Sequence, residues 1–381
     1  MPVFSHRCAS LRTLRRLALL AACLLLSLAG FAQRRPINPK ATPEARQLLK
    51  YLYKIKGKKT LSGMHNVLGK MSIPTDRVRQ LTGKYPAIWG GDFGFADSTH
   101  DIDNIKYRPL LVPEIKRQHA RGAIIVLSYH QANPTIGEPC DFQGGIISKL
   151  TDAQWQELLT PGTPLHQKWA AQMDLLAGHL QQLRAAHIPV IFRPYHEMNG
   201  SWFWWGGRPG AQGYLALWQQ LYTYYTEHHH LNNLLWAWTP DKPNPGVETY
   251  FPGRDKVDLL GTDIYPRKDS ANATYPQRWF NTMNRLAAGK PLGLSEHSQL
   301  VPPEQLQQQP YVWFMSWGEM LFKANSEEDI KRNYALPRVL GVEDVPRRLS
   351  KEGIFPIWRR PSATGFSRER AVARPCPAGT L

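Results

Sequence analysis

The chain has 381 residues, of which 42% are hydrophobic and 11% aromatic, and its formal net charge at pH 7 is +17. This length can bury a large core, either in one barrel-sized domain or in two smaller domains. Much of the positive charge lies in the first 16 residues and after Pro346, which leaves a mildly basic body and argues against a nucleic-acid partner.

Residues 1–32 have the three parts of a secretory signal. Four arginines between residues 7 and 16 precede an apolar stretch over residues 17–28, and Gly30 and Ala32 flank Phe31 at its end. We therefore expect cleavage after Ala32 and a secreted or periplasmic protein. The stretch is shorter than the roughly 20 residues that cross a bilayer, so no membrane span is expected. The apolar run continues past Cys23, which disfavours a lipoprotein signal ending there.

The mature chain is predicted to begin with a linker and a first helix over residues 33–58, and its first residues are polar and rich in proline. Cys8 and Cys23 lie inside the signal, which leaves Cys140 and Cys376. Two cysteines exclude a dense disulfide framework, and the sequence does not decide whether these two pair.

Eight short apolar runs recur between residues 59 and 346. They are Thr60–Gly63, Ala87–Trp89, Ala123–Leu127, Val190–Phe192, Leu234–Trp238, Val257–Leu260, Pro291–Leu294 and Tyr311–Phe314. Continuous apolar runs are typical of strands buried on both faces, and the segments 166–187 and 211–229 are long enough for helices. Eight such units predict an α/β protein with a (β/α)8 TIM barrel over residues 59–346. An open, doubly wound sheet is the alternative, but no glycine-rich phosphate loop follows an early strand.

Polar and aromatic residues follow nearly every predicted strand. They are His65, Asn66, Asp92, Phe93, His130, His196, Glu197, Asp263, Tyr265, Glu296, His297 and Trp317. In a (β/α)8 barrel the carboxyl ends of the strands share one face, and catalytic residues collect there. We therefore expect a functional site at that face.

The densest group of such residues is segment 193–206, which places an acid, a base and five aromatic side chains at one strand end. Cleavage of a glycosidic bond uses one carboxylic acid to protonate the leaving oxygen and a second carboxylate across the sugar ring. Glu197 is the candidate acid, and Glu296, at the end of the seventh predicted strand, is the candidate second carboxylate. A single glutamate at a strand end would more often form a salt bridge or a cap, but two at different strand ends favour chemistry.

The block from His196 to Gly200 with its aromatic continuation, and the pair Ser295-Glu296, resemble glycoside hydrolase family 26, best known for β-1,4-mannanases. The resemblance covers residues 59–346. It implies a (β/α)8 barrel and a retaining double displacement, with Glu296 as nucleophile and Glu197 as general acid/base. The implied activity is endo-hydrolysis of mannan, glucomannan or galactomannan without a cofactor. Hydrolysis of β-1,3-xylan or mixed-linkage β-glucan is one alternative, and a non-catalytic carbohydrate-binding barrel is another.

Further positions are similar to the family pattern and are predicted to bind substrate. They are His130, His196, Trp202, Asp263, Tyr265 and Trp317. Trp202 and Trp317 would form the floor of sugar subsites, and Tyr265 would hold Glu296. Arg193 precedes Glu197 on the same strand and would point into the barrel to donate to Glu296, although a purely structural salt bridge is the other interpretation.

No metal site is expected. His130, Glu197 and His297 lack the compact helical spacing of a zinc signature. The triplet His228–His230, near the end of a predicted helix, is interpreted as an exposed helix end rather than a ligand set. We expect a monomer whose partner is a mannan-type polysaccharide.

Residues 347–381 carry eight lysines or arginines against two glutamates and show little periodicity. This composition predicts a basic, disordered tail. The tail does not resemble the family.

Overall fold

The computed structural model of the chain describes residues 35–266 and 275–346, all of which lie in one compact unit. The predicted signal over residues 1–32 and the predicted tail over residues 347–381 lie outside the described residues, as does Cys376. Within the described part, no helix is both long enough and apolar enough to cross a membrane.

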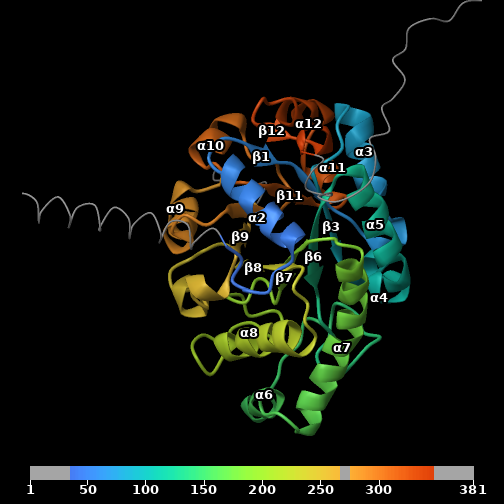
Figure 1. Cartoon of the computed structure of the whole chain (residues 1–381), viewed down its shortest axis with the longest axis vertical. Coiled ribbons are helices and arrows are strands. Elements are labelled where there is room, and N and C mark those ends of the chain that lie inside the picture. The colour runs from blue at the N-terminus through green and yellow to red at the C-terminus, as the bar shows by residue number, and fades with distance from the viewer. Residues whose placement is uncertain (1–34, 267–274, 347–381) are drawn as a thin grey trace, which may run out of the picture. The chain divides into compact units, whose positions relative to one another are not determined.

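Eight parallel strands close into a barrel (Figure 1). In order around the barrel they are β2 (Gly63–His65), β3 (Ile88–Asp92), β6 (Ile124–Tyr129), β7 (Val190–Pro194), β8 (Leu234–Trp238), β9 (Leu259–Asp263), β10 (Leu292–His297) and β11 (Phe314–Trp317). Because β11 pairs with β2, the sheet has no free edge. This closure confirms the predicted (β/α)8 barrel and excludes the open, doubly wound sheet.

Helices connect the strands and surround the barrel (Figure 1). They are α2 (Pro43–Ile55), α3 (Ile73–Thr82), α4 (Asn104–Tyr107), α5 (Leu111–Arg121), α6 (Asp152–Leu159), α7 (Pro164–Ala185), α8 (Tyr214–Thr223), α9 (Gln277–Ala287), α10 (Pro303–Gln308), α11 (Met320–Ala324) and α12 (Glu327–Tyr334). A π-helical turn, η4 (Tyr224–His228), continues α8. The long helix α7 begins at a threonine N-cap, Thr163, followed by Pro164, whose missing N–H would have had no partner in the first turn.

The barrel strands extend further along the chain than most of the predicted apolar runs. The first predicted strand is wrong: Thr60–Leu61 forms β1, which pairs with β12 (Val339–Leu340) outside the barrel, and β2 is the barrel strand. The eighth strand likewise begins at Phe314, where the predicted run ends. Asp92 and Asp263 are polar, yet their backbones still pair with neighbouring strands. The apolar runs in the sequence therefore end before the strands do. A short antiparallel pair, β4 (Ala96–Asp97) and β5 (Ile102–Asp103), follows β3.

Two apolar clusters lie on opposite faces of the barrel sheet. Along β6, Ile125 and Leu127 pack between the sheet and the helices, whereas Ile124 and Val126 belong to a second cluster. Because successive side chains of a strand alternate faces, the second cluster fills the barrel interior.

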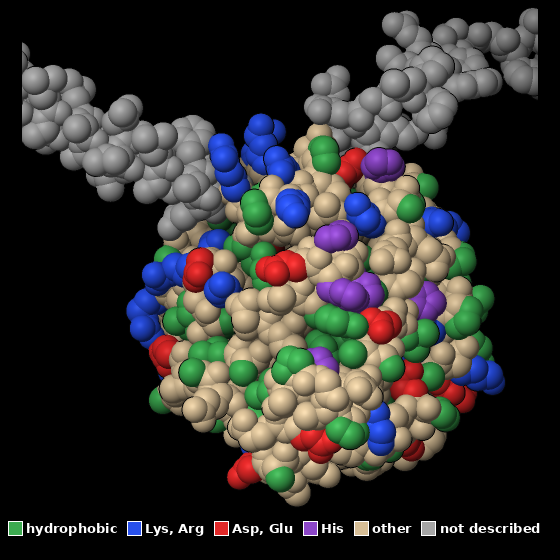
Figure 2. Space-filling view, turned by 60° about the horizontal axis from the view of Figure 1, so that its bottom comes forward, with side chains coloured by type: hydrophobic (Ala, Val, Ile, Leu, Met, Phe, Trp, Pro, Cys, Tyr) green, Lys and Arg blue, Asp and Glu red, His purple; other side chains and the backbone are tan. Residues whose placement is uncertain are grey.

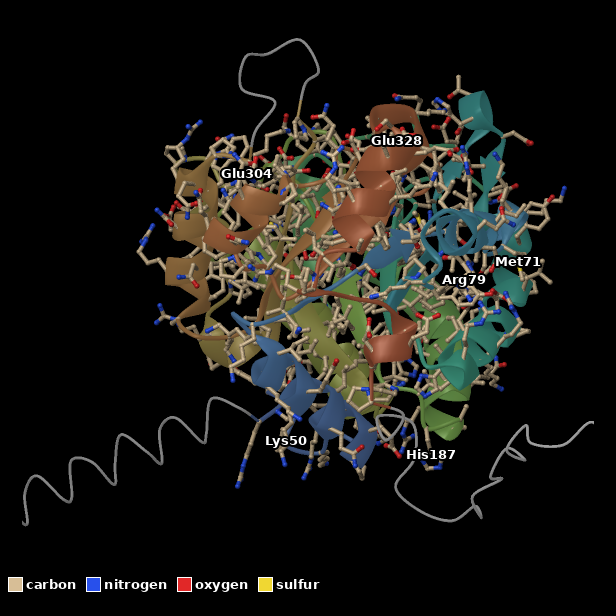
Figure 3. All side chains as sticks on the ribbon, turned by 90° about the horizontal axis from the view of Figure 1, so that it is seen from above. Lys50, Met71, Arg79, His187, Glu304 and Glu328 are labelled. Atoms are coloured by element: carbon tan, nitrogen blue, oxygen red, sulfur yellow. The ribbon has the colours of Figure 1, made fainter. Side chains whose placement is uncertain are left out.

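Helix α2 closes the amino-terminal end of the barrel. Leu52 of α2 is fully buried in the interior cluster, and the Thr42 N–H before α2 donates to the Asn232 carbonyl just before β8 at 2.8 Å. Figure 3 shows Lys50 of α2 and His187, which precedes β7, at this end. The opposite end, where the strands finish, is therefore the end available for a site.

Candidate active site

The candidate active site is built from side chains at the carboxyl ends of the strands. The residues are His65 on β2, Asp92 on β3, His130 after β6, Arg193 on β7, His196 and Glu197 after β7, Asp263 on β9, Glu296 on β10 and Trp317 on β11. Hydrogen bonds and ring contacts link Asp92, the three histidines and Trp317, hydrogen bonds link Arg193 to Asp263 and Glu296, and Glu197 is close enough to Glu296 to feel its charge. Glu197 and Trp317 are partly exposed and the others are buried, so these two reach the solvent side of the group.

Arg193 occupies the centre of the charged part of the site. Its Nη2 lies 2.8 Å from Asp263 Oδ2, and its Nη1 lies 3.0 Å from Glu296 Oε1. Burial acts to lower the pKa of Arg193, but the charges of Asp263 and Glu296 outweigh burial and raise the pKa. The planar guanidinium therefore fixes the positions of two carboxylates at once.

Both carboxylate oxygens of Glu296 accept hydrogen bonds. Arg193 donates to Oε1, and the Tyr265 hydroxyl donates to Oε2 at 2.9 Å. Burial and then the charge of Glu296 raise the pKa of Tyr265, so its hydroxyl stays a donor. His196 Nε2 lies 3.8 Å from Oε1. With a donor at each oxygen, Glu296 is arranged as a carboxylate with further lone pairs free to react.

Glu197 has the opposite environment. Burial, and after it the charges of Glu296 and Asp241, raise the pKa of Glu197 to about 8. Trp202 Nε1 donates to Glu197 Oε2 at 2.9 Å, which leaves the other oxygen to carry a proton. At neutral pH the side chain is therefore a carboxylic acid that can protonate a bound group.

The turn after β7 that carries Glu197 has an unusual backbone. Tyr195 and Glu197 have φ values of 48° and 55°, in the left-handed region that side chains other than glycine rarely adopt. The Glu197 N–H donates to the Thr239 carbonyl at 2.8 Å, which ties the turn to the end of β8. Such conformations cost about 1–3 kcal/mol each and cluster at active sites, where they aim a side chain.

A chain of hydrogen bonds runs from Asp92 through two histidines. His130 Nδ1 lies 2.9 Å from Asp92 Oδ2, and His130 Nε2 lies 3.2 Å from His196 Nε2. Burial acts to raise the pKa of Asp92, but His130 outweighs burial and lowers the pKa, so Asp92 accepts the Nδ1 proton. In the neutral form of His130 this leaves Nε2 as an acceptor, which makes His196 Nε2 the donor in that form. Burial lowers the pKa of His196 well below its usual value, so this ring is neutral.

Aromatic side chains line the open side of the site. The Trp317 ring stacks on the His65 ring with centroids 3.8 Å apart and an angle of 13° between the planes. Trp202 is partly exposed beside Glu197. Trp204 and Trp205 are buried and hydrogen-bonded to the Gln131 and His196 carbonyls, so they shape the turn from below.

A cavity of about 410 Å³ lies between the turns that follow β7 and β8. Its lining residues include Asn199, Trp202, Asp241 and Asn244. The Asn199 side chain accepts from the Asp241 N–H at 2.9 Å and donates to the Asp241 carbonyl at 3.0 Å, which locks the two turns together. Since Trp202 borders both this cavity and Glu197, a chain-like ligand could continue from the acid into the cavity.

One group at the site has the residue types of a metal centre. Ligand atoms of His196, Asp263 and Glu296 lie within 4.8 Å of one another. Arg193 donates to both carboxylates, however, and its positive charge opposes a cation between them. The set His130, Glu197 and His297 is not assembled either, because the His297 nitrogens face the Gln299 carbonyl at 2.7 Å and Ser316 Oγ at 3.1 Å.

All nine residues predicted for the site lie at the carboxyl ends of the strands or in the turns beyond them. Asp92, His65 and Asp241 also belong to the site, but no role was predicted for them. Asp92 and His65 lie at the ends of strands, as the predicted residues do. Their place at a strand end is therefore the feature of the sequence that indicates a role in the site. Asp241 acts on Glu197 through its charge across two turns, and the sequence contains no sign of this proximity.

Comparison with known proteins relates these features to one family. Residues 37–342 match glycosyl hydrolase family 26. Mannan endo-1,4-beta-mannosidase A of Piromyces sp is 30% identical over 321 residues, which are 81% of this chain and 50% of that protein. A mannan endo-1,4-beta-mannosidase of Bacillus subtilis is 27% identical over 77% of this chain and 84% of its own length. The chain thus spans about half the length of some of the curated relatives that it matches.

Solved structures share the fold over most of the described residues. GH26A from Muricauda sp. MAR_2010_75 superposes with a TM-score of 0.75 at 35% identity, over 81% of this chain and 99% of that chain. A beta-mannanase from a symbiotic protist of the termite Reticulitermes speratus, complexed with gluco-manno-oligosaccharide, superposes with a TM-score of 0.71 at 26% identity, over 82% and 98% of the two chains.

Proposed function

The chain belongs to glycosyl hydrolase family 26, and from this membership we propose that it is an endo-β-1,4-mannanase acting on mannan, glucomannan or galactomannan. The observation that carries the proposal is the contrast between two neighbouring glutamates. Glu197 has a pKa raised to about 8, whereas Glu296 accepts hydrogen bonds on both oxygens. Glycoside hydrolysis requires this pair of an acid and a carboxylate. The names of the related proteins support the mannan substrate.

The proposed reaction is a double displacement with retention of configuration. Glu296 attacks the anomeric carbon while Glu197 gives its proton to the leaving glycosidic oxygen, which forms a covalent glycosyl-enzyme. Glu197, now a carboxylate, takes a proton from water, and the water oxygen displaces Glu296. The second step restores both side chains to their starting protonation states.

The other predicted residues have supporting roles in this proposal. Trp202 and Trp317 provide flat apolar surfaces for sugar rings, and Trp202 also orients the acid. Tyr265 and Arg193 position Glu296, and Asp263 balances the charge of Arg193. His130 and His196 would contact the hydroxyl groups of the sugar.

The experiment is an assay of the mature protein on galactomannan, glucomannan, β-1,3-xylan and mixed-linkage β-glucan. Glu197→Ala and Glu296→Ala are the test variants, and Glu304→Ala on the exposed surface of α10, labelled in Figure 3, is the matched control. We expect mannan cleavage that both test variants lose and the control keeps. Cleavage of only another polymer, lost in the same variants, would preserve the mechanism and replace the substrate. Activity that survives in both variants would overturn the assignment of the carboxyl groups.

We also propose that the protein is a monomer exported to the periplasm or the medium. The support for export is the signal pattern over residues 1–32. Expression of the full chain should therefore yield an exported form whose first residue is Gln33, as read by amino-terminal sequencing. An uncut chain retained in the cytoplasm would contradict the export.

A further inference from the structure

The histidine triplet His228–His230 lies on the outside of the barrel, where the proposed hydrolysis does not use it. Helix α8 changes into the π-helical turn η4, which ends at His228. Single π turns are rare and occur often at functional sites, because they turn neighbouring side chains out of the normal helical order. Several histidines gather on the face that carries α6, α7 and α8 (Figure 2).

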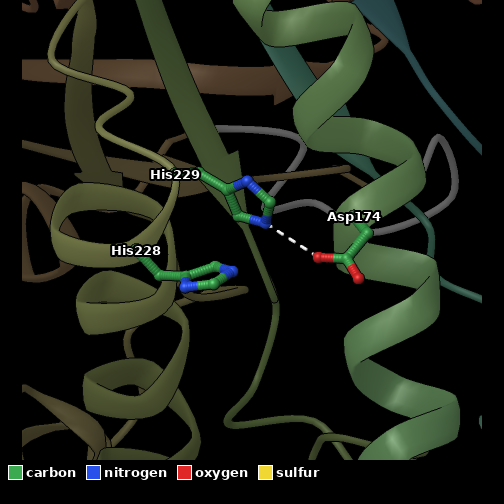
Figure 4. Close-up of side chains that lie close together, drawn as sticks. All are labelled: Asp174, His228 and His229. Carbon is green, nitrogen blue, oxygen red and sulfur yellow. Dashed lines mark hydrogen bonds and ion pairs between the residues drawn. The ribbon is translucent and has the colours of Figure 1, made fainter.

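Two of these histidines face a carboxylate on the neighbouring helix. His229 Nε2 lies 2.8 Å from Oδ1 of Asp174 on α7, and the rings of His228 and His229 have centroids 4.7 Å apart. Ligand atoms of Asp174, His228 and His229 all lie within 4.8 Å of one another. Figure 4 shows both rings directed from the end of η4 towards Asp174.

This set has the chemistry of a site for a late first-row divalent ion. Two imidazoles and one carboxylate suit Zn²⁺, and a tetrahedral Zn²⁺ places its ligand atoms about 3.3 Å apart. His228 and Asp174 are exposed and His229 is partly exposed, so small side-chain rotations can close the remaining distance. The ion would take the place of the hydrogen bond between His229 Nε2 and Asp174 Oδ1.

The surroundings favour a cation here more than at the buried group in the active site. Among the described residues, Asp174 forms an ion pair with His229 and with no lysine or arginine, whereas Arg193 binds both carboxylates of the buried group. The Tyr224 hydroxyl donates to Asp174 Oδ1 at 2.6 Å and would keep the carboxylate oriented after the ion enters, as outer hydrogen bonds do at metal sites. A surface depression of about 770 Å³, lined in part by His228 and Tyr224, gives water and the ion access.

We propose that Asp174, His228 and His229 bind one divalent transition-metal ion, with water completing its coordination. The ion joins α7 to the end of η4, the π-helical turn that continues the neighbouring helix α8. The site is separate from the glutamates at the strand ends, so its effect is on stability rather than on the chemical step. Metal binding at this surface does not depend on the proposed hydrolase activity.

The test is a calorimetric titration of the mature protein, without a polyhistidine tag, with ZnCl2. We expect one equivalent to bind the wild type, and the affinity to fall by about tenfold or more in His228→Ala, His229→Ala and Asp174→Asn. His230→Ala is the matched control, because His230 is exposed, belongs to the same triplet and lies outside the set, and it should bind like the wild type. Zn²⁺ should also raise the melting temperature of the wild type and the control more than that of the three variants.

Two results would overturn the proposal. One is a wild type that binds no Zn²⁺ at millimolar concentration. The other is binding that persists in all three variants but disappears in Glu296→Gln, which would place the ion in the buried active-site group. Far-ultraviolet circular dichroism of each variant shows whether it has folded. A loss of Zn²⁺ binding in a folded variant can then be attributed to the missing ligand side chain.

Discussion

At the level of single residues, the two glutamates differ because of their hydrogen-bond partners and their burial. Glu296 receives a donor on each oxygen, and one of these donors, Arg193, carries a full charge. Glu197 receives one neutral donor, Trp202, and loses hydration close to two other carboxylates. Such different environments distinguish the proposed acid from the proposed nucleophile before any substrate is bound.

The first prediction concerns the alkaline limit of hydrolysis. Because Glu197 must be protonated to act as the acid and its pKa is raised to about 8, kcat/KM should be maintained below that pH and fall as the pH rises through it. The apparent pKa belongs to the coupled pair of glutamates. Measurement uses pH profiles of the wild type on a manno-oligosaccharide, whose leaving group needs a proton, and of Glu197→Ala on an aryl mannoside, whose leaving group needs none. If the alkaline limb persists in the variant, Glu197 is not the acid.

The second prediction concerns Asp92, which touches no reacting atom and acts as a positioning residue. In Asp92→Asn the negative charge that holds the proton on His130 Nδ1 is lost, so the direction of the bond to His196 is no longer fixed. We expect kcat to fall by about tenfold or more and KM to change less, with the fold retained. Asp255→Asn, at an exposed aspartate, is the control and should keep its kcat. An unchanged kcat in Asp92→Asn would remove the histidine chain from the mechanism.

At the level of elements, the sequence predicts where strands begin better than where they end. The run Leu234–Trp238 matches β8 because both faces of that strand are apolar. In β10 the apolar run stops at Leu294, yet the strand continues through Glu296 to His297, because site residues keep their backbone pairing. The left-handed backbone at Glu197 was also beyond prediction, since it depends on contacts made by the folded turn.

The third prediction concerns Gly178, an exposed glycine inside α7. A methyl group added there meets no atom within 4 Å, and alanine favours a helix over glycine by about 1 kcal/mol. Gly178→Ala should therefore raise the free energy of unfolding by about that amount. The contrasting variant is Gly162→Ala, because Gly162 has φ +87° and alanine would be strained there. The free energy of unfolding, measured with denaturant, should rise in Gly178→Ala and fall in Gly162→Ala. A destabilised Gly178→Ala would mean that α7 is not a regular helix at that point.

At the level of the whole molecule, the order of apolar runs was sufficient to predict a barrel, because eight strand-and-helix units favour closure over an open sheet. The closing role of α2 was not predictable in the same way. Its apolar residues show that it is amphipathic, but not that they fill the amino-terminal end of the barrel. The resulting molecule has a packed end and a functional end, so substitutions at the two ends should have separable effects.

The fourth prediction tests this separation at Leu52. The side chain is fully buried in the cluster that joins α2 to the barrel interior, so Leu52→Ala leaves a cavity there and should cost about 2–5 kcal/mol of unfolding free energy. Because the site lies at the other end of the strands, kcat of the folded fraction at 25 °C should stay close to that of the wild type. Lys50→Ala, on the exposed face of the same helix, is the control and should change neither quantity. A loss of stability below about 1 kcal/mol in Leu52→Ala would show that α2 is not needed to seal the barrel.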